Sequence, residues 1–349
     1  MSILVTGGAG FIGSHLIKKL LEQNKPVSSI FERKVICVDD FCAPISTSAV
    51  RGGNDYYNPK YKRENIQEFL NNKDFKLYKQ DICDLKGLNK IFKNNTCNGQ
   101  SRTKIDTIIH LAARAGVRPS IEDSLLYYQV NVIGTVNLLE LAKKYNIKNF
   151  IFASSSSVYG NNKKVPFLET DSVDNPISPY AATKKAGELI CHTYHHLYNI
   201  NVACLRFFTV YGPKGRPDMA PYKFTELISE GKEMQMYGNG NTYRDYTYID
   251  DIVSGILASV DYIKNNKNIY EIFNLGNSKT VKLKYFIEVI EKVVGKRAKI
   301  KKMPIQPGDV AKTYADLIKS RKLLGYNPKV SIEEGIERFV KWYKSVRTR

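Results

Sequence analysis

Short apolar runs alternate with longer amphipathic stretches over the first two thirds of the chain. The apolar runs have the length and composition of strands, and the stretches between them repeat apolar positions at helical spacing. The pattern predicts strands over residues 3–6, 35–39, 75–80, 107–110, 149–153 and 201–206. It predicts helices over residues 11–23, 85–92, 125–145 and 179–198. Strands that alternate with helices indicate an α/β fold, in which a parallel sheet is covered on both faces.

The pattern loosens after residue 206, where glycine- and proline-containing loops separate shorter helices. We therefore predict a doubly wound parallel sheet over residues 1–206, with a returning segment near residues 244–265. Residues 207–349 are predicted to form a smaller mixed α/β C-terminal domain that mainly holds the substrate.

The composition is that of a folded protein. Of 349 residues, 43% are hydrophobic and 25% are charged, which excludes disordered and collagen-like classes. The length suggests two domains or one large domain with an appendage. No apolar stretch approaches the ~18 uncharged residues of a membrane span, and the chain begins without a secretory leader, so we expect a cytoplasmic protein that binds no membrane. Six cysteines show no metal-binding spacing, and we expect reduced thiols and no metal site.

The chain carries 53 basic and 34 acidic residues, a net charge of +19. A field of this sign attracts phosphates and would suit nucleic acid. The lysines are scattered, however, rather than gathered into a patch with interleaved aromatic residues, which favours solvated faces over a nucleic-acid site. A negatively charged small substrate would benefit from the same field.

A glycine-rich turn follows the first predicted strand and opens the first predicted helix. Its glycines permit a tight turn, a close approach of the backbone to a pyrophosphate and close packing of helix on strand, and the helix N-terminus then faces the phosphates. The motif indicates a dinucleotide site in a Rossmann sheet. The candidate cofactor-binding residues of the turn are Gly7, Gly10, Phe11, Ile12 and Gly13.

A carboxylate ends the second predicted strand. Asp39 can accept hydrogen bonds from the adenosine ribose and would repel a 2′-phosphate, which favours NAD over NADP. Asp40 competes for this contact, but Asp39 ends the apolar alternation and is preferred.

Three more candidates follow the next two strands. Asp81 and Ile82 could hold the adenine edge, and Ala112 would let the backbone approach the cofactor, although small residues there could serve packing alone. We interpret His110 as a core histidine rather than a catalyst.

A second constellation begins the helix over residues 179–198. Ser178 is the expected N-cap and Pro179 opens the first turn, so Tyr180 and Lys184, four residues apart, share a face. The ammonium and a positive nicotinamide ring would lower the pKa of the phenol. Four serines, residues 154–157, end the preceding strand, where parallel sheets place ligands. The serines alone could form only a turn, but together these features favour a catalytic site.

These motifs resemble the extended short-chain dehydrogenase/reductase family, specifically its nucleotide-sugar epimerases. The resemblance rests on Gly7-x-x-Gly10-x-x-Gly13, SSSSVYG at 154–160, Ser178-Pro-Tyr180-x-x-x-Lys184, RDYTYIDD at 244–251, QPGD at 306–309 and YAD at 314–316. It covers nearly the whole chain. Within the family, LRFFTVYGPKGRPDMA at 205–220 is most similar to UDP-glucuronate 4-epimerases.

The resemblance implies a reaction in which Tyr180 takes the proton from the sugar 4-hydroxyl while C4 loses hydride to tightly held NAD. Ser155 would bridge the same oxygen, and Lys184 would hold the nicotinamide ribose. The 4-keto sugar would turn over and regain hydride on its other face. The resemblance thus implies NAD as the cofactor of this protein.

The serine run separates this chain from related enzymes. Family 4,6-dehydratases carry Asp-Glu at the positions of Ser156 and Ser157, and UDP-glucuronate decarboxylases carry Glu at that of Ser157. Since this sequence has neither carboxyl group, it lacks the acid and base of an elimination.

The resemblance also implies the UDP-sugar contacts. Arg244 matches the arginine that pairs with the pyrophosphate, and Tyr237 could stack on uracil or be a core aromatic residue. A C6 carboxylate would bind Arg216 with the hydroxyls of Ser156 and Ser157, unless Arg216 is a solvated loop residue. The remaining candidate substrate residues are Thr209 and Asp309.

The sequence thus predicts 4-epimerisation of UDP-glucuronate to UDP-galacturonate. A UDP-glucose or UDP-GlcNAc 4-epimerase is the alternative enzyme, although Thr209 and Ala115 depart from galactose-type epimerases at two positions. A silent NAD-binding regulatory protein is a third possibility. Helices over 125–145 and 179–198 carry apolar positions on more than one face, and the resemblance implies that they form the four-helix bundle of a homodimer.

Overall fold

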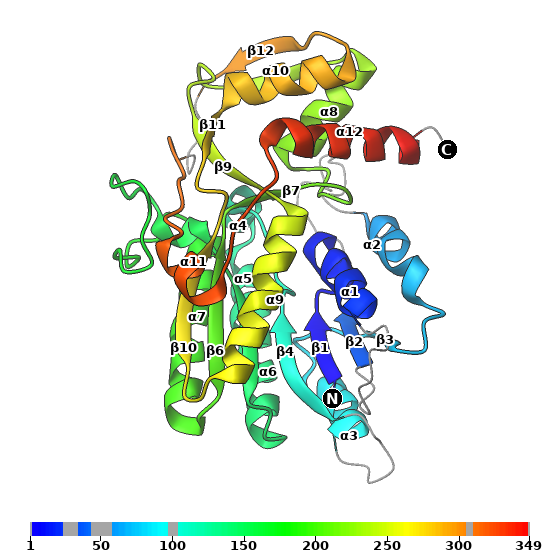
Figure 1. Cartoon of the computed structure of the whole chain (residues 1–349), viewed down its shortest axis with the longest axis vertical. Helices are drawn as coiled ribbons and strands as arrows, with labels where there is room; N and C mark the ends of the chain where they lie inside the picture. Colours follow the sequence, from blue (N-terminus) through cyan, green and yellow to red (C-terminus); the bar gives the residue numbers. More distant parts are fainter. Residues whose placement is uncertain (1, 24–33, 43–57, 97–103, 305–309, 348–349) are drawn as a thin grey trace.

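The larger region of the molecule is built around a seven-stranded parallel sheet (Figure 1). The computed structural model describes residues 2–23, 34–42, 58–96, 104–304 and 310–347. The strand order is β10-β6-β5-β4-β1-β2-β3. The strands are β1 (Ser2–Thr6), β2 (Lys34–Asp39), β3 (Phe75–Lys79), β4 (Ile105–His110), β5 (Asn149–Ser155), β6 (Asn201–Phe207) and β10 (Tyr270–Leu275). The order reverses beside β1, and ligands bind at such switch points.

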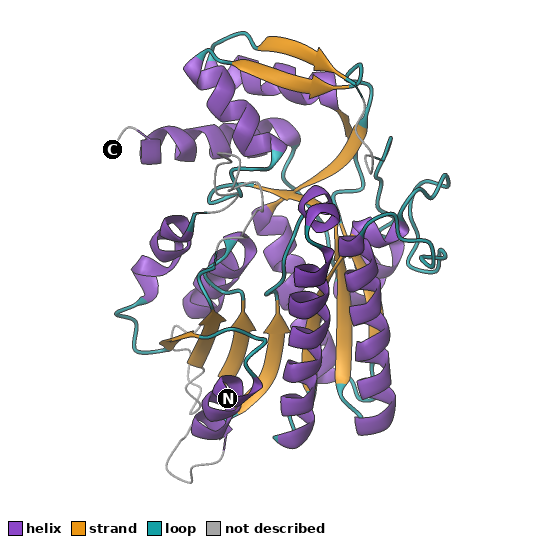
Figure 2. Ribbon diagram, turned by 180° about the vertical axis from the view of Figure 1, so that it is seen from behind, coloured by secondary structure: helices purple, strands orange, loops and turns teal. Residues whose placement is uncertain are grey.

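Helices cover both faces of this sheet (Figures 1 and 2). Ile3 and Val5 of β1 belong to one apolar core, whereas Leu4 belongs to the other, as the alternation of side chains along a strand requires. One face packs against α1 (Phe11–Gln23), α9 (Ile249–Asn265) and α11 (Ile318–Leu324). The other face packs against α3 (Leu85–Thr96), α6 (Gly134–Lys144) and α7 (Pro179–Tyr198).

A smaller mixed α/β region lies beyond the carboxyl ends of the main strands (Figure 1). A three-stranded sheet has the order β11-β9-β7, and β12 pairs with β8. Its strands are β7 (Thr209–Tyr211), β8 (Glu233–Tyr237), β9 (Tyr243–Tyr248), β11 (Thr280–Lys282) and β12 (Lys299–Met303). Its helices are α8 (Ala220–Glu230), α10 (Leu283–Val294) and α12 (Ile332–Arg347).

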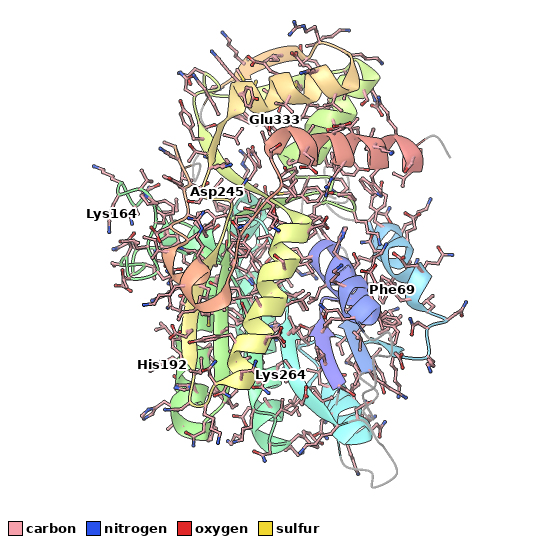
Figure 3. The ribbon with its side chains drawn as sticks, in the orientation of Figure 1. Phe69, Lys164, His192, Asp245, Lys264 and Glu333 are labelled. Atoms are coloured by element: carbon pink, nitrogen blue, oxygen red, sulfur yellow. The ribbon has the colours of Figure 1, made fainter. Side chains whose placement is uncertain are left out.

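Asp245 of β9 joins this region to the main sheet (Figure 3). Its buried carboxylate accepts backbone N–H groups of Asn277 (2.7 Å), Ser278 (3.0 Å) and Ala315 (3.1 Å). Three separate segments therefore meet at one side chain.

The predicted fold class, a Rossmann doubly wound sheet with a smaller C-terminal α/β region, is confirmed. Two features differ from the sequence prediction. Strand β10 joins the main sheet, although the sequence pattern gave no strand there. The predicted helix 125–145 is instead α5 (Ser124–Tyr128), a π turn (Gln129–Ile133) and α6.

Two expectations from composition can be compared with this structure. Within the described ranges, no helix is long and apolar enough to span a membrane. The cysteines that the structure describes are free thiols: Cys37, Cys42, Cys83, Cys191 and Cys204.

Candidate active site

A pocket opens at the carboxyl ends of β1, β4 and β5. All the predicted cofactor residues line it: Gly7, Gly10, Phe11, Ile12, Gly13, Asp39, Asp81, Ile82, Ala112, Tyr180 and Lys184. Arg216 also lines it, so a residue predicted for the substrate lies beside those predicted for NAD.

The glycine turn has the shape that a pyrophosphate requires. Gly7 has φ +69°, a backbone conformation that favours glycine, and a Cβ there would lie 2.7 Å from the amide nitrogen of Ala112. A Cβ at Gly13 would collide with the carbonyl oxygen of Gly7. Helix α1 begins directly after the turn, at Phe11, so its free N–H groups are directed at the pocket.

Asp39 lies under the glycine turn. Its Oδ2 accepts the N–H of Ala9 (3.1 Å), and its Oδ1 accepts the N–H of Phe41 (2.9 Å) and the Lys62 ammonium (3.0 Å). Asp40 also lines the pocket and lies 3.6 Å from the same ammonium. Lys62 comes from α2 (Pro59–Ile66) and was missed by sequence reasoning, because no motif or periodicity links it to Asp39.

The other predicted cofactor contacts follow β3 and β4. Asp81 accepts the N–H of Cys83 (2.8 Å), and Ala112 donates its N–H to the hydroxyl of Thr6 (3.3 Å). These bonds hold the backbone at the pocket rim.

His110 is a core residue, as predicted. Its ring nitrogens contact the hydroxyls of Thr6 (2.8 Å) and Thr135 (3.0 Å). Burial lowers its pKa to about 3, so the ring is neutral at pH 7.

Tyr180 and Lys184 project from the first turns of α7. Ser178 caps this helix by accepting the N–H of Ala181 (3.1 Å), and Pro179 occupies its first position. The buried Lys184 ammonium donates to the carbonyl oxygen of Ala153 (2.7 Å) and lies 5.9 Å from the centre of the Tyr180 ring. The helix therefore presents both groups to the end of β5.

Burial dominates the electrostatics of this pair. It raises the pKa of Tyr180, while a hydrogen bond with Ser155 and the charge of Arg216 act in the opposite direction. It lowers the pKa of Lys184 to about 8. The expected lowering of the Tyr180 pKa is therefore not a property of the protein alone, because the desolvation of the phenolate outweighs its neighbours.

The serines lie at the end of β5 and in the short helix Ser156–Tyr159. The Ser155 oxygen accepts the N–H of Ser157 (3.1 Å), and its hydroxyl donates to the Ser157 hydroxyl (3.2 Å). Ser156 and Ser157 are half-buried. Of the four serines, Ser154 lines the pocket.

The other predicted substrate residues are distributed over the C-terminal region. Thr209 lies in β7 and Arg244 in β9. Tyr237 ends β8 and is half-buried, with the guanidinium of Arg118 4.9 Å from its ring centre, so it is not an ordinary core aromatic residue. Asp309 lies outside the described residues.

A buried ion pair behind α7 is a further feature that sequence reasoning missed. Arg206 of β6 donates through Nε and Nη2 to the two carboxylate oxygens of Glu188, at 2.8 and 2.9 Å. Ser154 donates to the same carboxylate at 2.6 Å. Both charged side chains are 1% exposed. The signal was present, because Glu188 repeats the spacing of Tyr180 and Lys184 along one helix face.

Comparison with known proteins identifies the family. The sequence model of the "NAD dependent epimerase/dehydratase family" matches residues 3–276. The chain belongs to this family. This membership confirms the family predicted from the motifs and the predicted use of NAD. The glycine turn, the acceptor at Asp39 and the buried ammonium of Lys184 fit that cofactor.

Individual relatives are similar along nearly the whole chain. A UDP-glucuronate 4-epimerase of Thermodesulfobacterium geofontis is 41% identical over 342 residues, 98% of this chain and 95% of that protein. The crystal structure of UDP-glucuronic acid 4-epimerase from Bacillus cereus with UDP-glucuronic acid and NAD is 35% identical, with a TM-score of 0.85 over 99% of this chain and all of that one. DesIV, a dTDP-glucose 4,6-dehydratase of Streptomyces venezuelae, is 27% identical, with a TM-score of 0.84 over 100% of this chain and 98% of that one.

Proposed function

We propose that this protein is a UDP-glucuronate 4-epimerase, which interconverts UDP-glucuronate and UDP-galacturonate through a 4-keto sugar with NAD. The observation that carries the proposal is the juxtaposition of Arg216 with Tyr180 in one pocket. The sequence adds a serine run, residues 154–157, that contains no carboxyl group. The epimerase and the dehydratase named above have nearly the same fold, so the assignment depends on side chains.

The chemistry divides among three side chains. Tyr180 takes the proton of the 4-hydroxyl, and Ser155 holds the same oxygen by a hydrogen bond. NAD held in this pocket would supply reversible hydride transfer with C4 of the sugar. Lys184 anchors the nicotinamide ribose and stabilises the phenolate by its charge. After the keto sugar turns over, Tyr180 returns the proton to O4, so no external oxidant is consumed.

The C6 carboxylate is assigned to Arg216 and the hydroxyls of Ser156 and Ser157. A buried anion without donors is costly, and a guanidinium with two hydroxyls supplies them. The same donors hold the carboxylate away from the orientation in which a β-keto acid loses CO₂. Without Asp or Glu at positions 156 and 157, the site has no acid and base for elimination there.

We also propose how the chain divides its tasks. Residues 1–206, with the segment near 244–265, bind NAD, and residues 207–349 mainly bind the UDP-sugar. Arg244, at the start of the returning segment, pairs with the pyrophosphate, and Tyr237 of the second part stacks on uracil. Thr209 and Asp309 complete the substrate contacts. We expect the protein to act in the cytoplasm.

A homodimer is the proposed assembly. Apolar side chains on the two helical segments predicted for a bundle, and on the helix before them, are exposed: Ile121, Leu125, Tyr128, Ile133, Leu189 and Leu197. Leu125 is 81% exposed, an unusual position for leucine unless another surface covers it. Light scattering at micromolar concentration should give twice the chain mass, and a monomer would contradict the proposal.

Product analysis tests the function. Purified protein is incubated with UDP-glucuronate without added NAD, and the nucleotide sugars are separated. We expect UDP-galacturonate with little UDP-pentose, because the hydride returns to the sugar from which it came. A requirement for stoichiometric NAD would indicate a dehydrogenase, and UDP-pentose as the main product would indicate a decarboxylase.

A further inference from the structure

Arg216 is the first residue of a tight turn over residues 216–219, and Asp218 is the third. The N–H of Met219 donates to the carbonyl oxygen of Arg216 (3.1 Å), and Pro217 at the second position has the φ that such turns require. The turn brings Asp218 beside Arg216. Three residues before this turn, the carbonyl oxygen of Pro213 bonds to the His15 ring, 2.8 Å away.

The Asp218 carboxylate binds the Arg216 guanidinium side-on. Arg216 donates through Nε to Oδ1 (2.9 Å) and through Nη2 to Oδ2 (2.6 Å) of Asp218. The side chains are only 19% and 16% exposed, so this pair is shielded from water on most sides. Two parallel bonds fix the guanidinium plane as well as its position. Neither bond uses Nη1.

A second anchor ties the guanidinium to the other side of the pocket. The carbonyl oxygen of Ala115 accepts a bond from Nη2 of Arg216 (3.3 Å) and one from the hydroxyl of Tyr127 (3.0 Å). The buried Tyr127 ring packs edge-on against Tyr180, with centres 6.3 Å apart at 85°. The orientation of Arg216 is thereby coupled to the ring of the catalytic candidate.

We propose that Asp218 is a positioning residue for anionic sugars, which holds Arg216 so that its Nη1 edge receives the C6 carboxylate beside Tyr180. This inference rests on the proposed function. The substrate carboxylate binds without displacing Asp218, and the guanidinium then lies between two carboxylates. A neutral C6 hydroxymethyl group cannot form an ion pair with the guanidinium, so the Arg216–Asp218 pair favours UDP-glucuronate over UDP-glucose.

Asp218 also moderates the charge that Arg216 exerts on Tyr180. The groups that face Tyr180 from the elements around it are Lys184 of α7, Ser155 of β5, Tyr127 of α5 and Arg216 of the turn. Arg216 acts to lower the pKa of Tyr180. Removing the negative charge of Asp218 exposes Tyr180 to the full guanidinium charge, so the phenol should ionise at lower pH.

The test compares Asp218→Asn with Tyr127→Phe, which removes the hydroxyl that bonds to the Ala115 carbonyl oxygen without a change of charge. Thermal unfolding first establishes that both variants fold. In Asp218→Asn we expect kcat/KM for UDP-glucuronate to fall about tenfold or more, while that for UDP-glucose changes much less. The acidic limb of the pH profile should move to lower pH. Tyr127→Phe should lose activity on UDP-glucuronate without this shift, and Asp218→Glu should restore part of the loss.

Each contrary result has a distinct meaning. A lower KM for UDP-glucuronate with unchanged kcat in Asp218→Asn would show that Asp218 competes with the substrate, and would overturn the inference. Equal losses on both sugars with an unmoved pH limb would show a merely structural role and would also overturn it. A wild-type preference for UDP-glucose would instead refute the proposed function.

Discussion

The hydroxyl of Tyr180 is the group on which the proposed chemistry depends most. Burial raises its pKa, so the isolated protein keeps it protonated at neutral pH. The proton transfer then needs the positive charges that converge on the bound substrate, from Lys184, Arg216 and the oxidised cofactor. A preformed phenolate is therefore not part of the resting protein.

Replacement of this hydroxyl separates binding from chemistry. Tyr180→Phe should retain NAD, which is measured by the cofactor released on denaturation. It should lose far more than tenfold in turnover, a factor equal to about 1.4 kcal/mol of barrier. A loss smaller than tenfold would exclude Tyr180 as the base. Tyr127→Phe removes a neighbouring phenol outside the reacting atoms and should lose much less turnover than Tyr180→Phe.

The sequence predicted which residues line the site better than it predicted the pKa values of their side chains. The spacing of Tyr180 and Lys184 was sufficient to place both on one helix face, and the pocket contains both. The pKa directions could not be predicted, because they depend on burial by side chains distant in sequence. The ion pair of Arg216 with Asp218 was accessible in principle, because the Arg-Pro-Asp turn is local.

Among the elements, α7 is joined to the sheet by a buried ion pair as well as by apolar packing. Glu188 lies one turn beyond Lys184 and pairs with Arg206 of β6. Breaking such a pair leaves an uncompensated charge, whereas replacing both partners by apolar residues is often tolerated.

We therefore expect Glu188→Ala to cost about 3–5 kcal/mol in the free energy of unfolding. The double variant Glu188→Leu, Arg206→Met should recover most of this loss. Urea unfolding measures both values. A single variant as stable as wild type, or a double variant no more stable than the single, would show that the ion pair does not stabilise the packing of α7 on the sheet.

The predicted and observed bounds of the helices show which helix boundaries are determined by neighbouring residues in the sequence. Helix α7 was predicted at residues 179–198, as observed, because Ser178 and Pro179 mark its start. The π turn within residues 125–145 was not predicted. There the amide of Asn131 bonds to Arg114 (3.0 Å) and to Thr183 (3.0 Å), partners that the sequence pattern does not reveal.

For the whole molecule, the alternation of strands and helices was enough to predict the sheet through β6. It failed for β10, whose pairing with β6 spans about 70 residues of chain. Contacts such as those of Asp245 also join segments far apart in sequence, and no local pattern encodes them.

The stability of the whole molecule should depend on pH through His110. Burial holds its pKa in the folded protein at about 3, below the usual histidine value of 6.5. The unfolded chain therefore binds the proton first, so the contribution of the neutral ring is full above pH 6.5 and is lost as the pH falls toward 3. Asp245, with a pKa raised to about 6, acts in the opposite direction, so a comparison of two proteins is required.

The comparison is between wild type and His110→Gln. The stability cost of the substitution should be larger at pH 8 than at pH 5, as measured by urea unfolding at both values. A cost that is constant, or that grows as the pH falls, would show that the ring is not held neutral by its surroundings.

Recognition of a C6 carboxylate by Arg216 is tested by measuring kcat/KM for UDP-glucuronate and UDP-glucose with wild type and with Arg216→Ala. We expect wild type to prefer UDP-glucuronate. The variant should lose about 2–4 kcal/mol of transition-state stabilisation with that substrate and change little with UDP-glucose. A wild type that prefers UDP-glucose or UDP-GlcNAc, or a variant that loses both substrates equally, would contradict the account.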